Sequence, residues 1–128
     1  MRNVVTIIMA FLGIASCGPR TQVVELSKCW STSVGEHISG QAVLYAYDDS
    51  GCIECGAFLS ANGKCRATGI AIGSEQADFI LKNLLKASPK NDLDMIAAPV
   101  SFSGVTVRSG GKQGLMIRID RLDAHGGH

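Results

Sequence analysis

The amino-acid sequence predicts a small, mainly β domain of the α+β class, with five strands and one helix between the third and fourth strands. Three observations lead to this prediction. Stretches rich in strand-forming residues are separated by clusters of Gly, Asn, Asp and Ser, which favour turns. One segment, residues 75–87, has apolar residues at helical spacing. The length of 128 residues is typical of a single domain.

Residues 1–16 have the order of a secretion signal. Arg2 is followed by an apolar run over residues 4–12 and then by small residues before Cys17. The run is shorter than the roughly 20 apolar residues that a membrane-spanning helix needs. We therefore expect residues 1–16 to be removed as a signal peptide.

Residues Ile14, Ala15, Ser16 and Cys17 resemble the lipobox of bacterial lipoproteins, in which an aliphatic residue and two small residues precede an obligatory cysteine. The resemblance implies that the chain is cleaved before Cys17 and anchored to a membrane by lipid on its thiol. Because Gly18 rather than Asp follows the cysteine, it implies the outer membrane, facing the periplasm, in a Gram-negative cell. The alternative is an ordinary signal peptide, for which Ile14 is bulky at its place before the cut.

The charge of the chain bears on its partners. Without Arg2 the chain has eleven basic and eleven acidic residues, so its formal charge is zero when the histidines are neutral. Nucleic-acid binding proteins usually carry a basic excess, because neutralised phosphates supply much of their affinity. We therefore expect no nucleic-acid partner.

Residues 17–37 are predicted to form the lipidated N-terminus, a tether over 18–22 and a lead-in. Within them, residues 23–30 fit either an edge strand or part of the lead-in. The folded domain is expected over residues 38–122. Its first strand, 38–47, is rich in strand formers and ends at a turn cluster of Asp, Ser and Gly.

The second and third strands are predicted over residues 53–60 and 64–72. The Asn-Gly dipeptide at positions 62–63 favours a two-residue hairpin turn between them. Such a turn would place Cys65 opposite Ser60.

The helix has the strongest local signals of any element. Ser74 is a typical N-cap residue, and Glu75 and Asp78 lie in the first turn, where the helix dipole favours negative charge. Pro89 then stops the helix. Its apolar residues recur at helical spacing, and we expect the face with Ile80 and Leu84 to pack on the sheet. These apolar residues are Ala77, Ile80, Leu81, Leu84 and Leu85.

The last two strands are predicted over residues 99–108 and 114–122, and residues 123–128 are expected to be a flexible tail. The resulting order of elements resembles an OB-fold, a small five-stranded barrel with its helix between strands three and four. The alternative is a two-layer arrangement of a sheet and a helix.

Cys29, Cys52, Cys55 and Cys65 follow the signal, and an exported chain enters a compartment that permits disulfides. We expect two disulfides that brace the domain, with all three pairings open. Cys52 and Cys55 also form a C-x-x-C motif. A redox role of this motif normally requires that the motif open a helix. A structural zinc site usually requires two pairs of closely spaced cysteines.

Tyr45 and Tyr47 would project from one face of the first strand, which makes them a candidate ligand-binding face. The alternative is that both are packing residues. No motif of a catalytic site is present, and His125 and His128 are too few for a metal site. We therefore expect no catalytic residues, no metal ion and no cofactor.

Together these features predict a lipid-anchored periplasmic protein with a disulfide-braced β domain. We expect a non-enzymatic binding or envelope-associated module, with an envelope protein or a glycan as partner. One alternative is a thiol–disulfide or metal-dependent protein that uses Cys52 and Cys55. Another is a structural or inhibitor-like lipoprotein that acts by occupying a surface.

Overall fold

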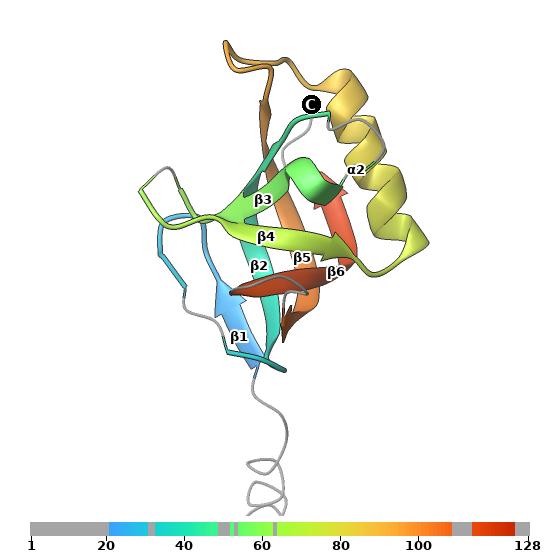
Figure 1. Ribbon diagram of the computed structural model, residues 1–128. Coiled ribbons are helices and arrows are strands. Elements are labelled where there is room, and N and C mark those ends of the chain that lie inside the picture. The colour runs from blue at the N-terminus through green and yellow to red at the C-terminus, as the bar shows by residue number, and fades with distance from the viewer. Residues whose placement is uncertain are drawn as a thin grey trace, which may run out of the picture.

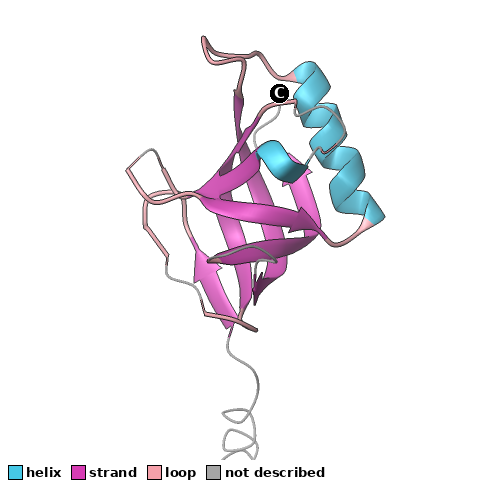
Figure 2. Cartoon of the chain, viewed as in Figure 1, coloured by secondary structure: helices cyan, strands magenta, loops and turns pink. Residues whose placement is uncertain are grey.

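A computed structural model describes residues 21–30, 33–48, 52, 54–62, 64–108 and 114–124. Its elements are shown in Figures 1 and 2 and are, in chain order, β1 (Thr21–Val24), β2 (His37–Ala46), the 3-10 turn η1 (Glu54–Gly56), β3 (Ala57–Ser60), β4 (Thr68–Ile72), α2 (Glu75–Ala87), β5 (Ile96–Arg108) and β6 (Leu115–Ala124). The predicted signal peptide, Cys17 and residues 125–128 lie outside the described residues.

Five of the strands close a barrel. Their order is β2-β3-β4-β6-β5, and β5 pairs back onto β2 along the whole length of β2. β4 and β6 run parallel, whereas the other neighbours in the barrel are antiparallel. The helix lies between the third and fourth barrel strands, so the predicted OB-like barrel is confirmed. The two-layer alternative is not adopted, because the β2–β5 pairing closes the sheet on itself.

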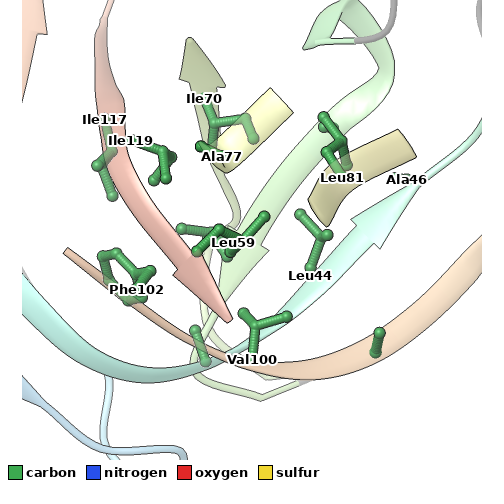
Figure 3. Close-up of a cluster of buried hydrophobic side chains, with 14 of the residues drawn as sticks. Leu44, Ala46, Leu59, Ile70, Ala77, Leu81, Val100, Phe102, Ile117 and Ile119 are labelled. Carbon is green, nitrogen blue, oxygen red and sulfur yellow. The ribbon is translucent and has the colours of Figure 1, made fainter. Parts of the chain in front are cut away.

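The inside of the barrel is filled by apolar side chains from alternate strand positions. On β2, Ala42, Leu44 and Ala46 are fully buried, whereas the residues between them lie on the outer face. Figure 3 shows Leu59 of β3 among side chains from the other strands, with Leu81 of α2 at one side of the cluster. Alternation with a period of two therefore decides which side chains form the core.

The helix α2 has the predicted bounds. The Ser74 side chain accepts a hydrogen bond from the backbone N–H of Ala77 at 3.1 Å, which satisfies one of the unpaired donors of the first turn. Ala77 and Leu81 are fully buried, and the remaining predicted apolar residues pack against the core while partly exposed. Packing on the barrel thus stabilises a helix of only 13 residues.

β1 adds a sixth strand beside the barrel and shortens the predicted tether. Thr21 and Gln22, assigned to the tether, pair in parallel with His37 and Ile38 of β2. This close approach depends on Gly40, whose φ is +140° and where a Cβ would clash with the carbonyl oxygen of Val24.

The β3–β4 hairpin differs from the predicted two-residue turn. Phe58 pairs with Gly69, which is a shift of two residues from the predicted register. The side-chain oxygen of Asn62 accepts hydrogen bonds from the backbone N–H groups of Lys64 and Cys65, at 2.7 and 3.2 Å. This local bonding makes a wider loop. A shift of two leaves every side chain on its predicted face.

The last strand is longer than predicted. β6 includes Asp123 and Ala124, which were assigned to the tail. They pair with Ser101 and Val100 of β5, and these backbone hydrogen bonds hold them in the sheet.

Candidate ligand-binding face and disulfide loop

Tyr45 lies on the outer face of the barrel, directly opposite Phe58. The two residues are register partners of β2 and β3, and both are half-buried. Each is flanked along its strand by buried residues, Leu44 and Ala46 beside Tyr45 and Ala57 and Leu59 beside Phe58. The two side chains therefore project outward from neighbouring positions of β2 and β3.

The pair is part of a longer apolar row across the barrel. Gly69 of β4 pairs with Phe58, Met116 of β6 pairs with Gly69, and Val107 of β5 pairs with Met116. All of these residues are half-buried. We call this set the apolar row: Tyr45, Phe58, Gly69, Met116 and Val107.

Gly69 makes a gap in the apolar row. A Cβ built on this glycine would meet no heavy atom within 4 Å, so the space outside β4 is open at this position. Its neighbours in register, Phe58 and Met116, have long side chains. The row is thus a shallow surface with its open point on β4.

Tyr47 lies two residues beyond Tyr45, just after the end of β2. Its backbone N–H donates to the carbonyl oxygen of Gly56 at 3.1 Å. A Cβ on Gly56 would lie 2.9 Å from Cζ of the Tyr47 ring, so the ring rests on the glycine. Tyr47 is 36% exposed. The two predicted tyrosines therefore have different neighbours, Phe58 for Tyr45 and Gly56 for Tyr47.

Sequence reasoning missed Phe58, Gly69, Met116 and Val107 as members of this face. Alternation along the strand puts Phe58 on the opposite face from Leu59, and this signal could have found it. The register between β3 and β4 was predicted two residues away, so Gly69 was not seen as the partner of Phe58.

The four cysteines form two disulfides, as predicted, and the structure gives their pairing. Cys29 bonds to Cys65, which joins the β1–β2 loop to the β3–β4 loop across 36 residues of sequence. Cys52 bonds to Cys55 only three residues away, in the loop between β2 and β3. The domain is therefore a small β domain that contains one long-range and one local disulfide.

Asp48, at the start of the segment that carries Cys52 and Cys55, lies beside α2. Cys55 is exposed and Cys52 is half-buried. Asp48, from the start of this loop, lines an open pocket of about 260 Å³ with residues of α2 and the loop after it. These residues are Lys82, Leu85, Lys86 and Lys90.

A second open pocket, of about 390 Å³, lies at the other end of β2. It is lined by Thr21, His37, Ile38, Ser39, Ser103, Gly104 and Asp120. In the part of the chain that the structure describes, no three His, Cys, Asp or Glu side chains are grouped closely enough to hold a metal ion. Within that same part, no helix is long and apolar enough to cross a membrane.

No protein-family model matches the chain, and neither a curated protein nor a solved structure matches it.

Proposed function

We propose that this chain is a lipid-anchored protein of the cell envelope whose barrel binds an envelope glycan on the apolar row without catalysing a reaction. The observation that carries the proposal is the outward-facing pair Tyr45–Phe58 beside the open position at Gly69. The proposed anchor is the lipid on Cys17, and the proposed location is the outer membrane, facing the periplasm, in a Gram-negative cell.

The direction in which β2 runs supports a binding face that lies away from the membrane. Cys17 is four residues before Thr21, and four residues reach about 14 Å at most. Thr21 pairs with His37 at the first end of β2. Tyr45 is eight residues further along the strand, roughly 26 Å away at the usual rise. An anchor at Cys17 would hold the His37 end near the membrane and leave the aromatic pair away from it.

The chemistry of the apolar row favours a sugar. Aromatic ring faces pack on apolar surfaces, and a tyrosine adds a polar hydroxyl for a hydrogen bond. OB-like barrels bind oligosaccharides and oligonucleotides across their second and third strands, which are β3 and β4 in this barrel. The balance of eleven basic and eleven acidic residues after the signal disfavours a polyphosphate ligand.

Titration of the purified chain with soluble peptidoglycan fragments and lipopolysaccharide core oligosaccharides, followed by calorimetry, tests the glycan proposal. We expect saturable binding that Phe58→Ala weakens by at least about tenfold, because burial of a phenylalanine side chain is worth about 1.5–3 kcal/mol. Phe79→Ala is the matched control, since Phe79 lies on α2 and is 63% exposed. Equal effects of the two variants would contradict the proposal. If a protein partner binds through Phe58 and the glycans do not, that protein replaces the glycan as the ligand of this face.

The anchor has its own test. The intact mass of the membrane-extracted protein should show cleavage before Cys17 and added acyl chains. Cys17→Ser should release the protein from the membrane fraction, because serine lacks the thiol that would carry the lipid. An unmodified N-terminus in the membrane fraction would contradict the anchor and would leave the glycan proposal to its separate test.

A further inference from the structure

The Cys52–Cys55 bond is placed differently from the Cys29–Cys65 bond in the fold. Cys52–Cys55 closes a loop with a sequence separation of three, and Cys29–Cys65 joins two loops with a separation of 36. Reduction of a disulfide that braces the fold also removes folding stability, whereas reduction of a local disulfide removes less of it. The short loop restricts the unfolded chain much less than the long one.

Contacts other than this bond hold the ends of the Cys52–Cys55 loop. Four register pairs join β2 to β3, the last being Ala46 with Ala57. Beyond them the backbone N–H of Tyr47 donates to the carbonyl oxygen of Gly56 at 3.1 Å. The hairpin therefore stays paired up to Tyr47 and Gly56 when the disulfide opens.

The two cysteine residues of this bond are not equally exposed. Cys55 is exposed, whereas Cys52 is half-buried. Exchange requires a thiolate to reach one sulfur in line with the bond that breaks, so access decides which sulfur is attacked. The exposed side is Cys55, and Cys52 is then the leaving group.

We propose that Cys52–Cys55 is a site of reversible thiol–disulfide exchange with a dithiol reductant, and that Cys55 is the sulfur where exchange begins. One thiolate of the dithiol attacks Sγ of Cys55, the Cys52–Cys55 bond breaks, and Cys52 leaves as a thiolate that takes up a proton. The second thiol of the dithiol then attacks the mixed disulfide and releases Cys55 as a thiol. Two electrons and two protons pass to the cysteine pair, and the dithiol becomes a disulfide.

Cys29–Cys65 acts as the structural bond in this proposal and as the internal control. Cys29 is also exposed, so its accessibility is comparable to that of Cys55. A difference in reducibility between the two bonds therefore reports how much the fold depends on each of them. The proposal does not depend on glycan binding.

The first test equilibrates the full chain with increasing ratios of reduced to oxidised dithiothreitol, then alkylates free thiols and locates them by peptide mass. We expect Cys52–Cys55 to open at a ratio about 30-fold lower than Cys29–Cys65, since the two loops differ by about 2 kcal/mol in the chain-entropy model. The barrel should keep its far-ultraviolet circular dichroism at that point. Opening of both bonds together, or loss of the barrel signal with Cys52–Cys55, would overturn the proposal.

The second test separates the two sulfurs. Cys52→Ser leaves Cys55 as a single thiol in this loop, and Cys55→Ser leaves Cys52. With an aromatic disulfide probe that releases a coloured thiol, Cys55 should react at least about tenfold faster than Cys52, because it is the accessible one. Equal rates, or a faster Cys52, would remove Cys55 as the entry point.

Discussion

Gln76 of α2 holds both backbone groups of Leu122 in β6. The side-chain Nε2 donates to the carbonyl oxygen of Leu122 at 2.6 Å, and the backbone N–H of Leu122 donates to Oε1 at 2.9 Å. On this edge of β6, pairing with β4 ends at Ile119, the partner of Ile72. The Gln76 amide therefore replaces a neighbouring strand and attaches the helix to the barrel.

Gln76→Ala should lower the free energy of unfolding by about 2–4 kcal/mol, because two backbone groups of a buried residue lose their partners. Gln76→Glu should cost less, since one acceptor oxygen is retained. Urea denaturation measures both. Gln41→Ala, at an exposed position of β2, is the control and should change the free energy by less than about 0.5 kcal/mol. A similar small change for Gln76→Ala would show that the amide contributes little.

Ser74→Ala should destabilise the domain by about 1–2 kcal/mol. The Ser74 hydroxyl accepts from the N–H of Ala77 and donates to the carbonyl oxygen of Asp120 at 2.7 Å, so it joins the start of α2 to β6. Ser88→Ala is the control at the other end of α2, where the backbone N–H of Ser88 makes the cap hydrogen bond to Leu84. Thermal unfolding of the two variants should separate them, and equal midpoints would contradict the prediction.

Removal of each disulfide should have a different cost. In the chain-entropy model the loop closed by Cys29–Cys65 contributes about 4 kcal/mol and the loop closed by Cys52–Cys55 about 2 kcal/mol. Replacement of each pair by two alanines and denaturation in guanidinium chloride measures the difference. A larger loss for the Cys52–Cys55 pair would mean that the loop between β2 and β3 is essential to the fold.

Gly69→Val should abolish glycan binding while the domain stays folded. A Cβ at this position meets no heavy atom within 4 Å, so a valine can fill the open point of the apolar row, and valine favours strands. Gly104→Val is the contrasting variant, because a Cβ there would clash with the carbonyl oxygen of Arg118. We expect Gly104→Val to unfold the barrel. Unchanged glycan affinity in a folded Gly69→Val variant would exclude this face as the binding site.

Sequence reasoning predicted the parts of the fold that depend on near neighbours. The bounds of α2 follow from Ser74, from helical spacing and from Pro89, all within one helix length. The inward and outward faces of β2 follow from alternation within one strand. These interactions join residues that are only a few positions apart, so the sequence pattern shows them directly.

Tertiary structure decided which strands and cysteines meet. A shift of two residues between β3 and β4 leaves the alternation of both strands unchanged, so the sequence pattern does not distinguish Phe58–Gly69 from the predicted pairs. The Cys29–Cys65 bond spans 36 residues, and its pairing depends on how the barrel closes. The sequence by itself determined the helix and the buried faces, whereas long-range pairing alone assembled the apolar row and the disulfides.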